Sequence, residues 1–267
     1  MNLNHVNRID DVIAILETII NESEKNNDPL GYFAALYQNV TIHVKEGIAN
    51  NYFDDGPRME QLDVVFAKRY LDAWYSYMNN EPVSLSWQRA FDLSTNYWPI
   101  VLQHILMGIN AHINLDLGTV AAEISRGKKL DDLENDFNKI NTILSSLVHE
   151  VQDDLSAVWP ALKYMLKWSG KVDDFLVDFS MKLAREGAWK YANQISKVPE
   201  PEVQVSIDER DKRVADIVHI ITKPGMIATF VLGIIRVTER GTASEKIRKL
   251  KYHIKDTDQI SAEIHLS

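Results

Sequence analysis

The segment from residue 99 to residue 124 constrains the fold most, because its helical pattern is apolar on nearly every side. At about 100° per residue, one continuous apolar arc is formed by Leu102, Ile105, Leu106, Ile109, Ile113, Leu117 and Val120. Small residues at Gly108, Ala111 and Gly118 would let neighbouring helices approach closely on the sides outside this arc. Such a helix must be surrounded by other elements. We therefore expect a central buried helix over about 99–124, starting near Pro99.

Most of the remaining chain also follows a helical pattern. Apolar residues recur at intervals of three and four, beginning with the series Ile9, Val12, Ile13, Leu16, Ile19 and Ile20. Alternating strand patterns are scarce, and only VQVSI at 203–207 hints at one, just after a connector at 198–203. The sequence predicts an all-α protein, a multi-helix bundle built around the 99–124 helix.

Domain organisation and composition add further limits. We expect a helical core domain over residues 1–198 and a C-terminal helical segment, 199–267, packed on it. The absence of cysteine rules out disulfides, thiolate metal sites and cysteine nucleophiles. The net charge of −9 argues against a nucleic-acid partner. The longest apolar run, 225–235, is too short for stable membrane insertion.

The N-terminal residues MNLNHVNRIDDV lack the basic stretch and apolar run of a signal peptide, so we expect a cytoplasmic protein. The sequence leaves a homodimer open.

Polar residues interrupt the apolar segment QHILMGINAHINLDLG, residues 103–118. They are Gln103, His104, Asn110, His112, Asn114 and Asp116. Such side chains are costly to bury without partners. His112 and Asp116 are four residues apart and therefore share a helix face. This spacing suits two ligands of one metal ion, or a carboxylate that orients an imidazole for acid–base catalysis.

Two residues on other helices are candidate partners for this pair. Asp63 falls in the middle of an apolar helix face, where a carboxylate needs a counter-charge, a metal ion or a proton. His43 lies at the edge of the apolar face of its own helix. Together with His112 and Asp116, they would form a mixed nitrogen and oxygen site for zinc, iron or manganese. Asp63 could instead act as the catalytic base.

The other polar residues of the segment have less direct roles. His104 lies about 12 Å along the helix axis from His112 and about 80° around it, so we place it at the margin of the catalytic site. Gln103, Asn110 and Asn114 cluster at the opposite edge of the helix. We expect these three amides to orient a small-molecule substrate.

Two interpretations of the segment remain open. In the first, the protein is a small-molecule enzyme with a buried His/Asp site. Metal-dependent hydrolysis is then the default reaction, because a metal-bound water can ionise near neutral pH. In the second, it is a non-catalytic binding or scaffold protein, and the His112–Asp116 pair satisfies itself and fixes helix packing.

Two other motifs are set aside. His149 and Asp153 repeat the spacing but point away from their apolar face, and the aspartates at 131–136 and 173–178 lie at or near helix starts.

Four stretches carry a resemblance to a known family. They are LYQNVTIHV (36–44), MEQLDVVFAKRYLDA (59–73), QHILMGINAHINLDLG (103–118) and AREGAWKYA (184–192). Together they resemble an uncharacterised bacterial family, a domain of unknown function, and NAHINLDLG is the most specific part. The resemblance implies an all-helical fold and brings no activity with it. The His-x-x-x-Asp spacing is also similar to part of the zinc-dependent phospholipase C site, although the N-terminal tryptophan ligand of that family is absent.

Overall fold

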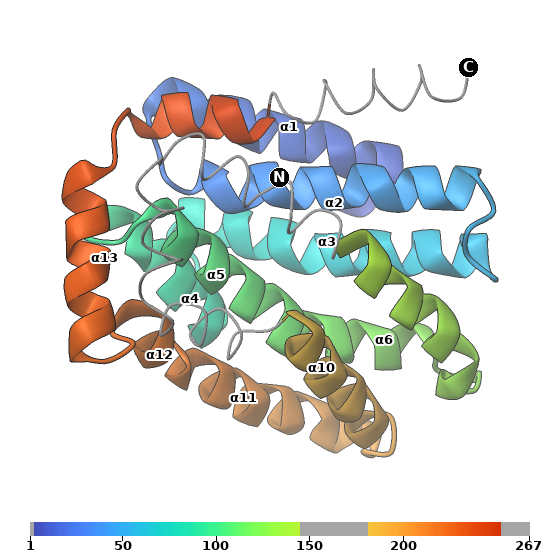
Figure 1. Ribbon diagram of the computed structural model, residues 1–267. Helices are drawn as coiled ribbons and strands as arrows, with labels where there is room; N and C mark the ends of the chain where they lie inside the picture. Colours follow the sequence, from blue (N-terminus) through green and yellow to red (C-terminus); the bar gives the residue numbers. More distant parts are fainter. Residues whose placement is uncertain (1–2, 145–180, 252–267) are drawn as a thin grey trace.

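The computed structural model describes residues 3–144 and 181–251, and every regular element within these ranges is a helix (Figure 1). The prediction of an all-α bundle is confirmed. His149, Asp153 and the aspartates at 173–178 lie outside the described residues.

The first three long helices pack against one another. They are α1 (Ile9–Asn26), α2 (Gly31–Ala49) and α3 (Gly56–Met78), stacked from top to bottom in Figure 1. Side chains spaced by three and four residues bury one face of α1, as the sequence predicts. The turn after α1 places Asn27 in the left-handed region, with φ 55°, a conformation that asparagine tolerates well.

The central segment forms a rod that other helices enclose. This rod consists of α5 (Val101–Ala111), the π-helical turn η3 (His112–Leu117) and α6 (Gly118–Ile124). On one side it contacts α2 and α3, and on the other it contacts α10 (Met181–Ile195) and α11 (Glu200–Asp216). The expectation of a central buried helix holds, since nearly all of its residues are buried.

Two details of the predicted central helix are wrong. The helix begins at Val101, two residues after Pro99, and it is not a regular α-helix throughout. Residues His112–Leu117 form a π-helical turn, in which each N–H bonds one residue further back than in an α-helix. A wheel drawn at 100° per residue is therefore displaced beyond Ala111. Turns of this kind often occur at functional sites.

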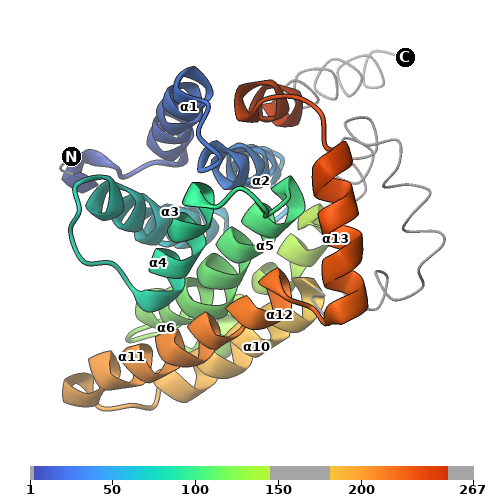
Figure 2. The same cartoon turned by 90° about the vertical axis from the view of Figure 1, so that its left-hand side faces the viewer.

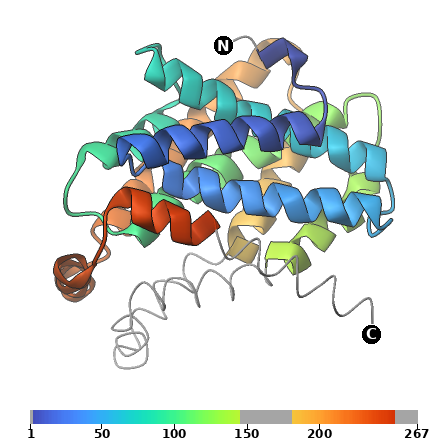
Figure 3. The ribbon, with the colours of Figure 1, turned by 90° about the horizontal axis from the view of Figure 1, so that it is seen from above.

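The C-terminal helices close the other side and one end of the bundle. They are α11, α12 (Val218–Thr222), α13 (Met226–Thr238) and a last helix at 243–251. Figure 2 shows α13 standing across one end of the bundle, and Figure 3 shows the 243–251 helix returning alongside α1 and α2. The hinted strand at 203–207 is wrong, because these residues form the middle of α11, which itself begins at Glu200 inside the predicted connector.

A short helix, capped by a residue of α11, packs against the central rod. The helix α4 (Leu85–Asp92) packs on α5 and α11. Its first two N–H groups donate to the carboxylate of Asp211, which reaches across from α11. A carboxylate here satisfies donors that the helix itself cannot pair. Within residues 3–144 and 181–251, no helix combines the length and apolar character needed to cross a membrane.

Candidate active site

The imidazole of His112 lies at the start of η3 and is enclosed by aromatic rings. It is only 2% exposed. Phe66 from α3 stacks on it with 3.6 Å between ring centroids and 8° between planes. Tyr37 from α2 meets it edge-on at 4.5 Å. Three further rings lie at 5.7–6.2 Å, and the whole set, which we call the His112 cage, is Phe33, Tyr37, Phe66, Tyr70 and Trp87.

Asp116, one turn after His112, holds the polar end of the cage in place. The indole N–H of Trp87 donates to Asp116 Oδ2 at 2.9 Å, and Arg69 Nε lies 3.6 Å from Oδ1. His112 Nδ1 lies 3.5 Å from Asp116 Oδ2, within ion-pair distance. Neither nitrogen of the His112 ring has a hydrogen bond among the described residues. The structure thus brings His112 and Asp116 together, as the sequence spacing predicts.

The electrostatics of the cage keep His112 neutral. Burial lowers the pKa of His112 below its usual value, and the nearby Asp116 carboxylate offsets this only in part. A neutral imidazole has one N–H donor and one acceptor nitrogen. Because Nδ1 faces Asp116, the tautomer with the proton on Nδ1 is favoured, and Nε2 is the nitrogen with a free lone pair.

Asp63 lies on α3 in the same buried region. Burial, with a smaller contribution from Glu60, raises the pKa of Asp63 to about 7. Its Oδ2 atom is buried and has no hydrogen-bond partner among the described residues. Burial is the main cause that raises the pKa of Tyr37, and the charge of Asp63 adds to this shift. Asp63 is therefore electrostatically connected to the His112 cage through Tyr37.

Several buried polar atoms around His112 lack partners within the described part of the chain. We call this group the unpaired cluster: both ring nitrogens of His112, the hydroxyl oxygens of Tyr37 and Tyr70, and Oδ2 of Asp63. The rings of Tyr37 and Tyr70 are 5.9 Å apart and both contact the His112 ring. Over 90% of buried polar groups in proteins are hydrogen-bonded. So many unpaired groups in one ring network indicate a place where polar atoms of water or of a ligand bind.

The expected metal-ligand set is not assembled. Among the residues that the structure describes, no three His, Asp or Glu side chains are arranged to hold a metal ion. His43 is half-buried on α2, and its Nδ1 lies 3.0 Å from the carbonyl oxygen of Asn39 in the preceding turn. The pair His112–Asp116 is present, but the structure does not gather His43 and Asp63 around it as one ligand group.

The three amides expected to orient a substrate are instead bonded to the protein itself. Gln103 accepts from the N–H of Ile100 and donates to the carbonyl oxygen of Ile221 in α12. Asn110 donates to the carbonyl oxygen of Val214 in α11 and accepts from Asn114. These bonds tie the C-terminal helices to α5. The bonds to Ile221 and Val214 could not be predicted from the helical wheel, because these two partners lie more than 90 residues away in sequence.

His104 lies apart from the His112 cage, near the N-terminal end of α5, where its ring meets Tyr32 edge-on at 5.7 Å. Burial lowers the pKa of His104 to about 4, with smaller contributions from Arg236 and Lys246. His104 is therefore neutral at pH 7. It lines a separate pocket and does not share the environment of His112.

The cage residues are the functional candidates that the wheel analysis missed. Phe33 and Tyr37, and likewise Phe66 and Tyr70, are pairs spaced by four. Such pairs present two rings on one helix face. Two facing pairs opposite a buried histidine are a pattern that could have indicated the cage from sequence.

The fold and this site define a class of protein: an all-helical bundle with a polar, aromatic-enclosed motif on its central helix. Comparison of the sequence with models of known protein families identifies the family. The sequence model of a family described as "Family of unknown function (DUF5995)" matches residues 9–224, and the chain belongs to this family. The predicted resemblance to a family of unknown function is confirmed. No curated protein and no solved structure matches the chain.

Proposed function

We propose that the protein is an enzyme that binds a small polar molecule beside His112 and uses this neutral imidazole for proton transfer. The observation that carries the proposal is the unpaired cluster, in which five buried polar atoms form no hydrogen bond within the described residues; of these, only Nδ1 of His112 faces a charged group, the Asp116 carboxylate. Leaving each such atom unpaired costs about 1–3 kcal/mol. A structure tolerates this cost most readily where a bound molecule supplies the missing hydrogen bonds.

Each group has a role that follows from its chemistry. His112 Nε2 accepts a proton from the bound molecule, and Asp116 stabilises the imidazolium that forms and holds the ring orientation. Trp87 and Arg69 keep Asp116 in place. The tyrosine hydroxyls offer hydrogen bonds to the bound molecule. Asp63, with a pKa of about 7, exchanges a proton readily near neutral pH.

Metal-dependent hydrolysis does not fit the described residues as well. Catalytic zinc sites use three protein ligands, and the described residues offer no group of three candidates. The proposed proton transfer therefore uses only side chains of the protein. Acid–base catalysis by the His112–Asp116 pair needs only the imidazole and the carboxylate, which the structure places 3.5 Å apart.

The test replaces the imidazole by a ring of similar shape. His112→Phe should fold and melt at the same temperature as wild type or higher, because the phenyl ring fits an aromatic cage and has no nitrogens to leave unpaired. A screen of small polar metabolites by thermal shift should find compounds that stabilise wild type and not His112→Phe. Zn²⁺, Mn²⁺ and Fe²⁺, added to chelator-treated protein, form a separate arm.

A matched control and the contrary outcome complete the design. His219→Phe makes the same change at an exposed position on α12 and should leave every compound shift in place. If His112→Phe lowers the melting temperature by several degrees while no compound distinguishes it from wild type, the proposal is wrong. The imidazole would then be a packing device, as in the scaffold interpretation. A stabilising metal ion lost in His112→Phe would restore the metal-site hypothesis.

A further inference from the structure

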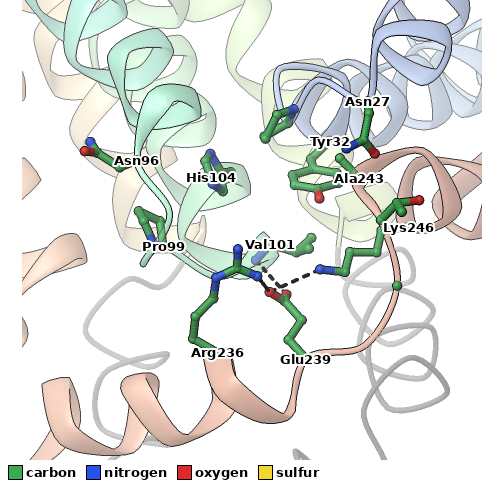
Figure 4. Close-up of a pocket in the computed structure, with 13 residues that line it drawn as sticks. Asn27, Tyr32, Asn96, Pro99, Val101, His104, Arg236, Glu239, Ala243 and Lys246 are labelled. Carbon is green, nitrogen blue, oxygen red and sulfur yellow. Dashed lines mark hydrogen bonds and ion pairs between the residues drawn. The ribbon is translucent and has the colours of Figure 1, made fainter.

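A second pocket lies at the N-terminal end of α5, away from the His112 cage. Its volume is about 240 Å³, and it is bounded by the starts of α2 and α5, the end of α13 and the 243–251 helix. Figure 4 shows His104 and Tyr32 on one side of it and Arg236, Glu239 and Lys246 on the other. None of these five residues belongs to the His112 cage. We call it the α5 pocket.

Three charged side chains meet at one wall of the α5 pocket. Glu239 accepts from the N–H of Val101, the first residue of α5, at 3.2 Å. The same carboxylate is paired with Arg236 at 2.6 Å and with Lys246 at 3.2 Å. Both Glu239 and Lys246 have almost fully buried side chains, with exposures of 1% and 6%. Two cations therefore share one directly bonded anion, and the exposed Glu245 carboxylate also acts on Lys246 from further away.

Two buried polar side chains in the α5 pocket have no hydrogen bond among the described residues. Tyr32 is 4% exposed and His104 is 9% exposed. Each lines the pocket, and their rings contact each other. Neither the Tyr32 hydroxyl nor the His104 ring has a partner among the hydrogen bonds of residues 3–144 and 181–251. Their polar atoms are not among the fully enclosed ones without a partner, so they are open to the pocket, where a ligand can bond them.

The polar groups that remain free in the α5 pocket are mainly donors. Lys246 has three N–H donors and one bonded partner in the described structure, Glu239. The oxygen of Asn27 already accepts from Ser244, so its NH₂ group is the part left to bind. The hydroxyl of Tyr32 can donate as well. A pocket rich in donors and poor in free acceptors suits a ligand rich in acceptor oxygens.

We propose that the α5 pocket is a binding site for a small organic carboxylate, held by Lys246 and Arg236 with Tyr32, His104 and Asn27 as further partners. Arg236 and Lys246 have only Glu239 as a direct ion-pair partner in the described structure, so a second carboxylate can pair with them. The volume of about 240 Å³ lies below the roughly 300–1,000 Å³ of pockets for drug-sized ligands, so a small ligand fits it best. Burial lowers the pKa of Lys246, with the Glu239 carboxylate opposing the shift, and a second anion beside the ammonium group would relieve this cost.

The test uses acetate and lactate as probes, with acetamide and lactamide as uncharged analogues of similar shape. Binding to the 267-residue protein is measured by calorimetry and thermal shift at constant ionic strength. The two carboxylates should bind and stabilise the protein, and the two amides should not. Lys246→Met should weaken carboxylate binding at least about tenfold, the loss expected for one charge-assisted hydrogen bond.

Two further variants separate this site from a purely structural ion pair. Glu239→Gln keeps an acceptor for the Val101 N–H but removes the resident negative charge, so it should tighten carboxylate binding. If Glu239 served only a structural ion pair, Glu239→Gln would lower the stability of the protein and would not tighten carboxylate binding. Tyr32→Phe keeps the ring contact with His104 and loses the hydroxyl, so it should weaken binding with little change in melting temperature. It tests the site even where Lys246→Met does not fold.

The control is Arg126→Met, which removes one positive charge from an exposed ion pair with Glu200. It should leave carboxylate binding unchanged. The proposal is overturned if acetate and lactate do not bind wild type, if Lys246→Met and Arg126→Met have equal effects, or if inorganic phosphate binds as tightly as the carboxylates. Because no variant here touches the His112 cage, failure of this proposal and failure of the proposed enzyme function are distinguishable.

Discussion

Asp63→Asn tests the electrostatics of the buried site most directly. Asp63 is 7% exposed, and burial raises its pKa from 3.8 to about 7. Below pH 3.8 the carboxyl group is protonated in both the folded and the unfolded protein. Between pH 3.8 and pH 7 the folded protein holds the proton more tightly, so the free energy of unfolding falls as the pH rises. Above pH 7 the full cost of the buried charge is present.

The size of this cost follows from the shift. About three pKa units at 1.36 kcal/mol each give about 4 kcal/mol, an upper value because relaxation and water penetration reduce the cost. Asparagine is neutral and close in shape to the protonated acid. Asp63→Asn should therefore match wild type near pH 4 and exceed it by about 1–4 kcal/mol at pH 8. The difference should grow steadily between these two pH values.

Urea unfolding of wild type and Asp63→Asn at pH 4, 5.5, 7 and 8 measures this difference. The control is Asp132→Asn, an exposed aspartate in the turn η4 (Leu130–Leu133), which should change stability by less than about 0.5 kcal/mol at every pH. An Asp63→Asn variant that is less stable than wild type at pH 8 would refute the reasoning. It would mean that a cation or a strong donor compensates the Asp63 carboxylate.

Three further stability predictions follow from the same structure, two from packing at glycines and one from a helix cap. Gly118→Ala should lower stability by about 1–3 kcal/mol or more, because a Cβ there would lie 2.5 Å from the backbone oxygen of Ala188. Gly233→Ala, where no described atom lies within 4 Å of the new Cβ, should instead raise stability by up to about 1 kcal/mol. Asp211→Ala should cost about 1–2 kcal/mol, because the first two N–H groups of α4 lose their acceptor. Chemical denaturation measures all three, and equal effects at the two glycines would contradict the packing argument.

The sequence by itself determined the helical class and the burial of the central motif. Local spacing suffices for this, because a helix repeats every 3.6 residues and its apolar face must be covered. The same local rule brought His112 and Asp116 together, since residues four apart share a helix face. It also identified Asp63 as buried, because this residue interrupts an otherwise apolar face of α3.

Only the tertiary structure decided what surrounds these residues. The π-helical turn at His112–Leu117 is not visible in a pattern read at 100° per residue. The His112 cage gathers rings from three helices, α2, α3 and α4, and the bonds of Gln103 and Asn110 to α12 and α11 span more than 90 residues. The α5 pocket likewise joins His104 to Arg236 and Lys246. Local periodicity fixes which face of a helix is buried, whereas the partner of that face depends on how distant helices cross, and this is set by packing of the whole chain.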